Sequence, residues 1–409
     1  MKLSREEEAM LGGKLGYPVQ KSMEILVALG EIYEAEKMVP VTHAHLVGFL
    51  VREGVRPFVE EMAAKGARFI IPATANFVSF DLQRWREMGI PEEYHAEQMA
   101  LLKAYEQMGA IISPTCAPYQ VGHAPGLGEH VSWAESSAVI FANSVLGART
   151  NREGGPVPLA AAITGRTPFC GYHLDEKRWG EVRVVVTTEL RGNTDFATLG
   201  YFTGGIVQER SPVFTGITGS VSRDQLKFLG AALATSGAVT LFHVAGVTPE
   251  APTEAAAFGG KKPDETIEFG RRELEQTAAE LSAAAGNGLD MVVIGCPHAS
   301  INEIKTIAGL LEGRRVHSGV AFWVLTSVPV KAYAERAGYA RTLAEAGVQI
   351  ICETCPLVMP DDYFPQHGHR TFATNSAKMA FYLRTHNVMM PHYGPLERCV
   401  DAAVSGVWR

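Results

Sequence analysis

Met291-Val-Val-Ile-Gly-Cys-Pro-His298 is the stretch that decides the fold of this chain. Its four apolar residues form a short run typical of a buried strand, and Gly295 and Pro297 end that strand in a turn. Two other apolar runs lead into cysteines in the same way, Val348-Gln-Ile-Ile351 into Cys352-Glu-Thr-Cys355-Pro356 and Gly109-Ala-Ile-Ile-Ser113 into Thr115-Cys116-Ala-Pro118. Open α/β sheets build their sites at strand ends. Three thiols at one sheet edge would indicate a metal or cluster site rather than a set of disulfides.

The C-terminal half alternates between strand-like and helix-like segments, which predicts a mainly parallel sheet covered by helices on both faces. The strands are expected at 237–243, 289–294, 319–326, 348–352 and 370–374, and the helices at 265–285, 301–312, 328–346 and 377–385. Ser300-Ile-Asn-Glu303 is a capping box that starts a helix directly after the Gly-Cys-Pro-His loop. The fold class is therefore α/β, and the loops after the strands should share one edge.

The N-terminal part mixes helices with short strands. Helices are expected at 4–15, 20–36 and 92–108, and strands at 68–71 and 111–112. In the second helix Met23, Leu26, Leu29 and Ile32 recur at helical spacing. Ser132 and Glu135 form a capping-box pattern that predicts a helix through about 146. The turn-rich stretch from Arg210 to Val221 suggests two domains, 1–210 and 211–409.

Composition narrows the class of protein. The 409 residues are 46% hydrophobic and 20% charged, and the net charge is -7 with acids and bases interspersed. This favours an ordinary soluble protein and argues against a nucleic-acid stripe or a basic membrane patch. The charged start Met1-Lys-Leu-Ser-Arg-Glu-Glu-Glu8 has no signal-peptide core, and no apolar run is long enough to span a membrane. Six cysteines are too few for a disulfide framework, so a reducing cytoplasm is expected.

The six cysteines are expected to have different roles, either as cluster ligands or as buried core residues. Cys116, Cys296 and Cys355 each follow a strand exit, and three thiolates suit an iron–sulfur cluster with one iron left open as a Lewis acid. Cys352 belongs to its strand and is expected in the core, and Cys170 and Cys399 are interpreted as small buried hydrophobes. The lone Cys352-Glu-Thr-Cys355 pattern lacks the second pair of a zinc site. Any single one of the three exit cysteines could also be a buried core residue.

Two segments have the composition of anion sites. Asn143-Ser-Val-Leu-Gly-Ala-Arg149-Thr-Asn-Arg-Glu-Gly-Gly155 turns sharply, and Arg149 with Arg152 can clamp a carboxylate; the alternative is two solvated arginines. Asn143, Ser144 and Asn151 are the polar candidates of the same segment. Thr374-Asn375-Ser376-Ala-Lys378 opens a helix, either as an anion site or as a plain N-cap. Asn76, after Ala73-Thr-Ala, is a weaker candidate for substrate binding.

Among 13 histidines, His298 and His45 are the catalytic candidates. His298 follows Cys296 by two residues on the same loop. Lone histidines are more often core or surface residues, so this alternative stands for both positions.

Taken together, several motifs of this chain resemble the aconitase X family, in particular its separate large subunit. The resemblance extends over nearly the whole chain. It rests on Leu3-Ser-Arg-Glu-Glu-Glu8, Gly16-Tyr-Pro-Val-Gln-Lys21, Met23-Glu-Ile-Leu-Val-Ala-Leu-Gly30, Pro114-Thr-Cys-Ala-Pro-Tyr119, the 143–155 segment, Val247-Thr-Pro-Glu250, Gly295-Cys-Pro-His298 and Thr374-Asn-Ser-Ala-Lys378.

The resemblance implies an aconitase-like core of parallel or mixed sheets flanked by helices, with its site at the carboxyl edge of the strands between domains. It also implies an iron–sulfur cluster on Cys116, Cys296 and Cys355, whose type, [4Fe-4S], [3Fe-4S] or [2Fe-2S], is left open. The resemblance does not require Cys352, so the third ligand is ambiguous. The implied partner is a small swivelling-domain subunit that supplies a catalytic serine.

The activities known in the family are dehydrations, of cis-3-hydroxy-L-proline to Δ1-pyrroline-2-carboxylate or of mevalonate 5-phosphate. In the mechanism we expect, Arg149 with Asn151 or Lys378 holds the substrate's carboxylate or phosphate. A base from the partner takes the α-proton, and His298 protonates the leaving hydroxyl, which departs as water. Hydroxyproline is favoured because no further cluster of basic residues for a phosphate dianion is evident beyond Arg149, Arg152, Arg166 and Lys378.

Two hypotheses from other functional classes remain. One is a non-catalytic iron–sulfur, zinc or RNA-binding regulatory protein, against which the net charge of -7 argues. The other is a thiol enzyme that pairs Cys296 with His298.

Overall fold

The computed structural model describes residues 1–47, 55–76, 78–360, 362–386 and 388–409. Its contacts divide the chain into two compact units. Unit 1 comprises Met1–Val78 and Gln83–Trp179, and unit 2 comprises Ser79–Leu82 and Gly180–Arg409. The sequence places the domain boundary after residue 210, which falls inside unit 2. In the described part of the chain no helix has the length and apolar character that crossing a membrane requires.

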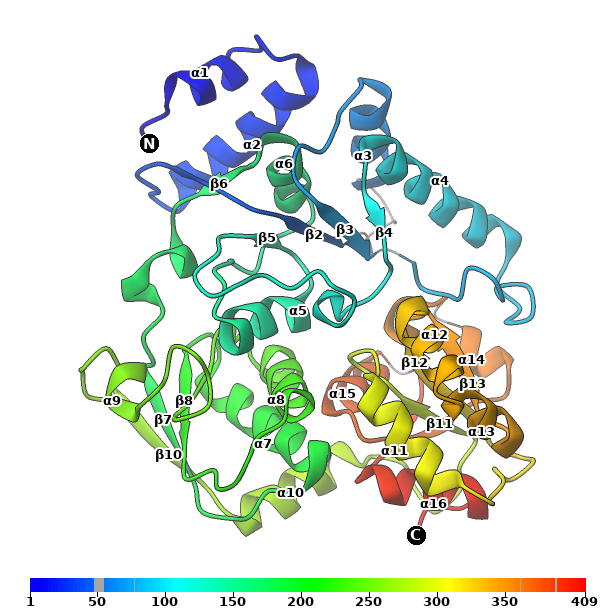
Figure 1. Ribbon diagram of the computed structural model, residues 1–409. Coiled ribbons are helices and arrows are strands. Elements are labelled where there is room, and N and C mark those ends of the chain that lie inside the picture. Colours follow the sequence, from blue (N-terminus) through cyan, green and yellow to red (C-terminus); the bar gives the residue numbers. More distant parts are fainter. Residues whose placement is uncertain (48–54, 77, 361, 387) are drawn as a thin grey trace. The chain divides into compact units, whose positions relative to one another are not determined.

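Unit 1 is built around a parallel four-stranded sheet in the order β4-β3-β2-β5. These strands are Ile111–Ile112, Ala73–Asn76, Ala44–Val47 and Ser132–Trp133. A separate antiparallel pair joins β1 (Met38–Pro40) to β6 (Arg166–Pro168). The helices are α1 (Arg5–Leu11), α2 (Tyr17–Ile32), α3 (Val55–Ala64), α4 (Glu92–Met108), α5 (Ser136–Phe141) and α6 (Pro156–Thr164), with a π-helical turn at Ala142–Leu146 (Figure 1).

The helical pattern of residues 20–36 is only half confirmed. Met23 and Leu26 of α2 are buried and pack with Val157 and Ala160 of α6. Ile32, the last apolar position of that pattern, is exposed at the end of the helix. The helix at 92–108 and the strand at 111–112 are confirmed at the predicted bounds.

Two predictions in unit 1 are wrong. The strand expected at 68–71 lies instead at Ala73–Asn76, because parallel pairing with β2 orders the segment that looked like a loop. Ser132 does not cap a helix but pairs with Ala44 as part of β5, and the helix begins at Ser136 with Glu135 at its N-cap. A tertiary strand pairing overrides the local capping signal there.

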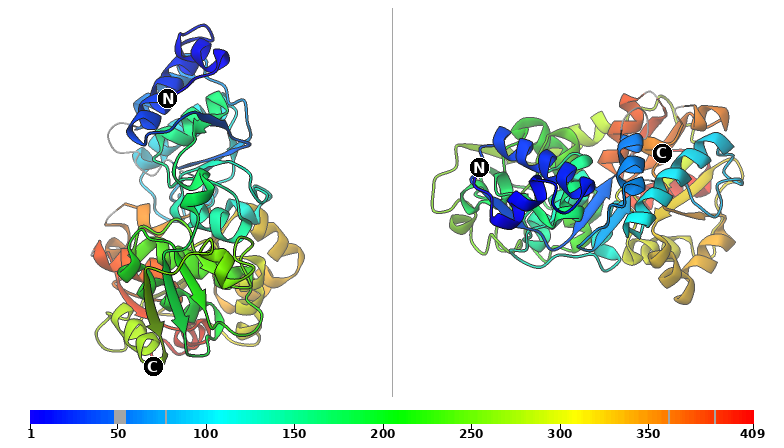
Figure 2. Two further views of the ribbon diagram at one scale, coloured as in Figure 1. Left: turned by 90° about the vertical axis from the view of Figure 1, so that its left-hand side faces the viewer. Right: turned by 90° about the horizontal axis from the view of Figure 1, so that it is seen from above.

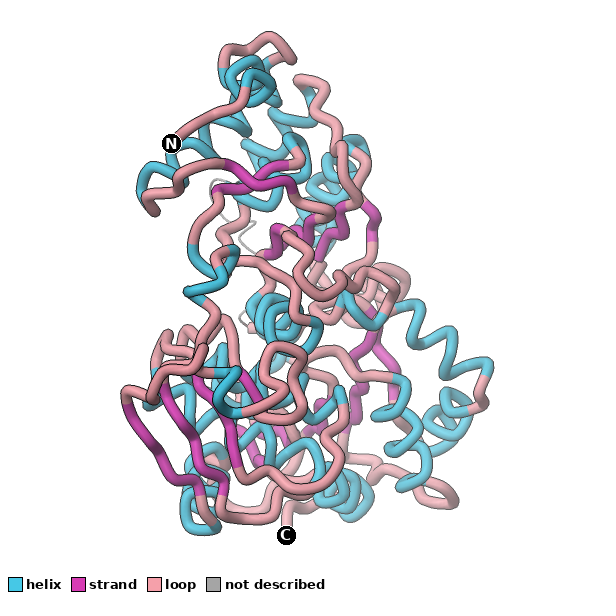
Figure 3. Tube along the Cα trace, turned by 60° about the vertical axis from the view of Figure 1, so that its left-hand side comes forward, coloured by secondary structure: helices cyan, strands magenta, loops and turns pink. Residues whose placement is uncertain are grey.

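Unit 2 contains two parallel sheets. The first has the order β10-β7-β8-β9, formed by Glu265–Phe269, Val182–Val186, Pro212–Thr215 and His243–Val244. Its strands run side by side in Figure 3 and in the left view of Figure 2. The helices that accompany it are α7 (Gly192–Val207), α8 (Arg223–Ser236), α9 (Glu254–Ala257) and α10 (Arg271–Leu281), and α7 packs along α8 (Figure 1).

The second sheet of unit 2 has the order β13-β12-β11-β14-β15 and is parallel throughout. Its strands are Gln349–Cys352, Ala321–Thr326, Met291–Ile294, Thr371–Thr374 and Met390–Tyr393. The flanking helices are α11 (Ile301–Leu311), α12 (Val328–Arg336), α13 (Tyr339–Ala346), α14 (Tyr363–Gln366), α15 (Ala377–Thr385) and α16 (Leu396–Ser405). The predicted α/β fold with parallel sheets is confirmed.

Several expectations for unit 2 were wrong in detail. The sequence did not identify the strands at 182–186, 212–215 and 390–393. The segment 265–269 is a strand rather than the start of a helix, because it pairs with β7 as an edge strand whose polar side chains face solvent. The segment 237–242 is irregular and only His243–Val244 pairs. The helix expected at 328–346 is two helices, separated at Gly338 with φ +83°.

A buried carboxyl group joins three parts of unit 1. Glu153 lies in the 143–155 segment, and its Oε1 accepts a hydrogen bond of 3.1 Å from Thr167 of β6. Its Oε2 accepts a second hydrogen bond from Ser132 of β5. Burial raises the pKa of Glu153 to about 7, and the two hydroxyl donors only partly oppose that shift.

Glu153→Gln should therefore flatten the pH dependence of stability. Between the unfolded pKa near 4.5 and the folded pKa near 7 the folded chain binds the extra proton, so stability falls as pH rises through this window. The wild type and the variant should unfold alike at pH 4.5, and at pH 8 the variant should be more stable by up to about 3 kcal/mol. Urea titrations of both proteins across that range check this. Equal stability differences at every pH would contradict it.

Candidate active site

The loop between β11 and α11, residues 295–300, is the Cys296 loop, and its conformation depends on Gly295. Its φ is +107°, and a Cβ built there would lie 2.2 Å from the carbonyl oxygen of Leu325 on β12. A backbone that passes this close to its neighbour leaves room only for glycine. Cys296 follows directly, is 9% exposed and forms no disulfide.

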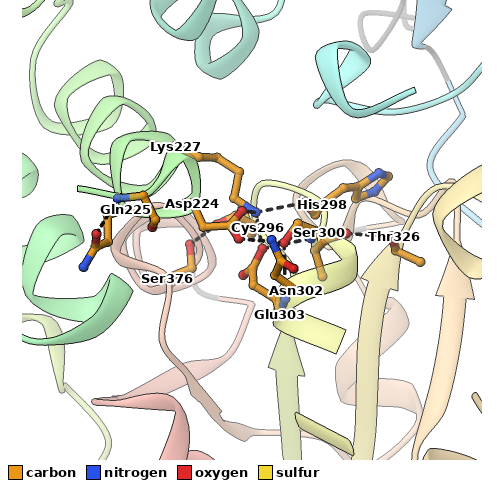
Figure 4. Close-up of polar contacts among 12 residues, drawn as sticks. Asp224, Gln225, Lys227, Cys296, His298, Ser300, Asn302, Glu303, Thr326 and Ser376 are labelled. Carbon is orange, nitrogen blue, oxygen red and sulfur yellow. Dashed lines mark hydrogen bonds and ion pairs between the residues drawn. The ribbon is translucent and has the colours of Figure 1, made fainter. Parts of the chain in front are cut away.

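Side chains from three other elements bind the carbonyl groups of this loop. Ser376, the N-cap of α15, donates its hydroxyl to the carbonyl of Cys296. Lys227 of α8 donates to the carbonyl of His298 at 3.2 Å. Thr326, the last residue of β12, donates to the carbonyl of Ala299 at 2.8 Å. The backbone that carries the Cys296 thiol is thus fixed from several sides (Figure 4).

The loop ends in the predicted capping box. The Ser300 hydroxyl accepts from the N–H of Glu303, and the Glu303 carboxylate accepts from the N–H of Ser300 at 2.9 Å. The same carboxylate forms an ion pair with the buried Lys227 ammonium, and Ser300 also donates to Asp224 of α8 at 2.8 Å. Burial raises the pKa of the Glu303 carboxyl, although the Lys227 charge opposes that shift.

The loop after β13 lies next to the loop after β11. The ring nitrogen Nε2 of His298 is 3.1 Å from the carbonyl oxygen of Thr354. Because a carbonyl oxygen only accepts, Nε2 carries the proton and the imidazole links the two loops. Asp81, from the Ser79–Leu82 segment of unit 2, accepts the N–H of Cys352 at 3.0 Å.

The two cysteines of this second loop differ in environment. Cys352 is buried at the end of β13, and burial raises the pKa of its thiol to about 12. A thiol held protonated in this way is a poor metal ligand, since the thiolate is the form that binds. Cys355 is partly exposed beyond the strand, where the sequence places the ligand.

The start of α15 lies beside the Cys296 loop. Asn375 and Ser376 are buried, and Lys378 in the first turn is 9% exposed. Among the residues that the structure describes, none hydrogen-bonds to the Oδ1 atom of Asn375, although this residue is only 1% exposed. A buried acceptor of this kind is costly unless a ligand or water donates to it. The predicted anion site thus places a helix N-terminus, a lysine and an open acceptor next to Cys296.

In unit 1 the polar residues of the 143–155 segment are used internally. Asn143 exchanges two hydrogen bonds with the backbone of Thr150. Asn151 accepts from the N–H of Tyr172 at 2.8 Å. The Arg149 guanidinium donates to the carbonyl of His173 at 3.0 Å and forms an ion pair with Asp175. Ser144 is buried in the π-helical turn. A carboxylate clamp at Arg149 therefore has to compete with Asp175.

The remaining unit 1 candidates end up in different surroundings. His45 is fully buried on β2, with Nδ1 2.8 Å from the Thr74 hydroxyl, and burial lowers its pKa to about 3. Its imidazole is therefore neutral at physiological pH, and so low a pKa makes it a weak base as well. Asn76 is buried at the end of β3, and Cys116 is partly exposed between β4 and the short helix at Pro118–Gln120.

The donor chemistry of unit 2 fits two of the three expected cluster ligands. Cys296 and Cys355 form no disulfide and lie on loops after strands of one parallel sheet, and the His298–Thr354 hydrogen bond joins those loops. Within the described ranges, no group of three or more His, Cys, Asp or Glu side chains is gathered as a metal would require. The third expected ligand, Cys116, belongs to unit 1.

Comparison with known families covers almost the whole chain. Models of the aconitase X first, second and third domains match residues 1–176, 180–279 and 289–405. The chain belongs to the aconitase X family. The first of these matches ends near the last residue of unit 1, and the other two lie within unit 2.

Relatives and a solved structure agree with this membership. The chain is 44% identical to the phosphomevalonate dehydratase large subunit of Methanothermobacter thermautotrophicus over 93% of each chain. It is 39% identical to the cis-3-hydroxy-L-proline dehydratase of Pseudomonas aeruginosa, covering 99% of this chain and 70% of that protein. The crystal structure of Thermococcus kodakaraensis aconitase X in its holo-form is 36% identical, with a TM-score of 0.89, over 98% of this chain and 100% of that one.

Sequence reasoning missed the residues that support the loops. Lys227, Asp224 and Asp81 carry no motif, because their partners lie far away in sequence. Glu303 was identified only as a capping residue. Thr354 contributes its backbone, which no side-chain pattern reports.

Gly295→Ala tests the close contact between the backbone of Gly295 and the carbonyl group of Leu325. The new methyl group would meet the Leu325 carbonyl, so the variant should lose about 3 kcal/mol or more of stability in urea unfolding. Gly309→Ala is the matched control, because Gly309 lies in α11 with nothing within 4 Å of its built Cβ. That control should be neutral or more stable by up to about 1 kcal/mol. Equal effects of the two substitutions would contradict the account.

Proposed function

We propose that this chain is the large, catalytic subunit of an iron–sulfur-dependent hydro-lyase that dehydrates a small 3-hydroxycarboxylic acid. The observation that carries the proposal is the match of all three aconitase X domains, together with relatives named dehydratases at up to 44% identity. Two relatives are named as large subunits, which supports the proposal that this chain also has a small-subunit partner. None of the six cysteines, all within the described residues, forms a disulfide, which supports a reducing compartment, the cytoplasm.

Cys116, Cys296 and Cys355 are the cluster ligands in this proposal. When bound, the cluster supplies an iron that polarises the leaving hydroxyl as a Lewis acid. The chain's own residues do the rest. The hydrogen bonds to the Cys296 loop hold one thiol in place, and the burial of Cys352 at the end of β13 leaves the partly exposed Cys355 as the ligand of the pair.

The substrate carboxylate belongs at the start of α15 in this proposal. The helix N-terminus and Lys378 favour an anion there, and the open Oδ1 of Asn375 can accept from a substrate N–H or O–H. A serine of the small subunit takes the α-proton. His298 donates a hydrogen bond from Nε2 to the carbonyl of Thr354, so we assign it the role of linking the two loops. To act as the acid as well, it has to deliver a proton carried on Nδ1.

Two substrates share the required chemistry, a carboxylate with a hydroxyl on the β-carbon. We favour cis-3-hydroxy-L-proline because Arg149 and Arg166 are already engaged in ion pairs, with Asp175 and with Glu6 and Glu7, and a phosphate dianion needs several cations. The open acceptor at Asn375 also suits an amino acid, whose ammonium donates. Mevalonate 5-phosphate is the second candidate, favoured by the 44% identity to a phosphomevalonate dehydratase large subunit of similar length.

Cysteine variants test the cluster. Cys116→Ala, Cys296→Ala and Cys355→Ala should lose bound iron, visible absorbance and activity after anaerobic reconstitution, because each removes one ligand. Cys352→Ala and Cys399→Ala are matched controls that should keep iron, with stability lowered by only about 1–2 kcal/mol. Iron loss in Cys352→Ala but not in Cys355→Ala would reverse the assignment of the third ligand. Full activity of cluster-free protein would refute the proposed mechanism.

The substrate is tested with the full chain reconstituted with its small subunit. Dehydration of cis-3-hydroxy-L-proline, followed as formation of the cyclic imine, should exceed dehydration of mevalonate 5-phosphate by at least about 100-fold in kcat/KM, because a buried polar site discriminates strongly. The large subunit alone should be inactive on both. The opposite preference would establish the phosphomevalonate activity, and turnover of neither would remove both candidates.

A further inference from the structure

Lys227 of α8 is a buried cation that contacts both the Cys296 loop and the helix α11 that follows it. Its side chain is 1% exposed, and its Nζ forms an ion pair with Glu303 of α11. The same Nζ donates to the carbonyl of His298 at 3.2 Å and lies 3.6 Å from a carboxylate oxygen of Asp224. Figure 4 shows the lysine reaching from α8 toward the loop and the start of α11.

Stability alone is a poor explanation for this ion pair. Removing two charges from water offsets most of their attraction, and apolar residues of similar volume are often as stable in their place. Lys227 does something that an apolar residue cannot do, since its ammonium donates to several acceptors at once. One of those acceptors is a backbone carbonyl two residues after Cys296.

The acceptors of Lys227 are themselves fixed. The Glu303 carboxylate also accepts the N–H of Ser300, which ties it to the first turn of α11. Asp224 accepts the hydroxyl of Ser300, so α8 binds the end of the loop through two side chains. Lys227 therefore connects three points, α8, the first turn of α11 and the carbonyl of His298.

We propose that Lys227 is a positioning residue that holds the Cys296 loop in the conformation in which its thiol binds the iron–sulfur cluster. This role rests on the proposed function. Without the ammonium, the carbonyl of the buried His298 loses the hydrogen bond that Nζ donates. Ser376 and Thr326 still bind the carbonyls on either side, so the loop loosens at its centre without unfolding.

Three variants of the full chain separate positioning from mere charge balance. Lys227→Met removes the donor and leaves Glu303 buried without its cation, so it should lower the unfolding temperature. The double variant Lys227→Met/Glu303→Gln also removes that charge, and it should recover most of the loss. Val184→Ala, a buried substitution in β7 away from the loop, provides a control with lowered stability only.

The measurements are amide hydrogen exchange of Cys296, His298, Ala299 and Ser300 in the cluster-free chain and the rate of iron loss to a chelator after reconstitution. The double variant should exchange these amides faster and release iron at least about 10-fold faster than the wild type, despite its recovered unfolding temperature. Val184→Ala should release iron at the wild-type rate.

Wild-type exchange and iron retention in the double variant would overturn the proposal and leave Lys227 as a counter-ion of Glu303. Equally fast iron loss from Val184→Ala would also overturn it, because retention would then follow stability. A wild-type chain that takes up no iron would instead refute the proposed function and this role with it. The two failures are therefore distinguishable.

Discussion

The backbone of the loop between β11 and α11 depends on donors that come from elsewhere in unit 2. The carbonyls of Cys296, His298 and Ala299 are each bound by a side chain from a different element. A buried carbonyl without a donor is costly, so these hydrogen bonds determine where the chain can run. Ser376, Lys227 and Thr326 must therefore be in place before the loop has a single conformation.

Parallel strand pairing explains how these donors reach one place. In the sheet β13-β12-β11-β14-β15 all strands point the same way, so the loops after them share an edge although long crossovers separate them in sequence. The His298 imidazole then joins the loops after β11 and β13. The short Ser79–Leu82 segment adds Asp81, which binds the backbone of Cys352 and keeps that residue within the core. One edge of one sheet thus gathers the chemistry of unit 2.

Sequence patterns predicted the secondary structure correctly where interactions between neighbouring residues determine it. The capping box of Ser300 and Glu303 and the helices at 92–108 and 377–385 form as predicted, because turn and helix contacts lie within a few residues. The same kind of signal failed at Ser132, where pairing with Ala44 draws the residue into a strand. The polar edge strand at 265–269 resembled a helix because only one of its sides meets a partner. Prediction failed wherever a distant neighbour outweighed the local pattern.

The sequence by itself determined the α/β class, the strand exits that carry Cys296 and Cys355, and the family resemblance that the comparisons confirm. Alternation of apolar runs and helix caps is enough for this, since each is a property of neighbouring residues. The burial of Cys352 follows from its strand position, but only the tertiary structure decided that its pKa is raised and that the Asn375 Oδ1 has no donor among the described residues. It also decided that Lys227 and Glu303, 76 residues apart, meet beside His298. Burial and hydrogen bonding between distant residues exist only after the strands have paired, so no local pattern in the sequence records them.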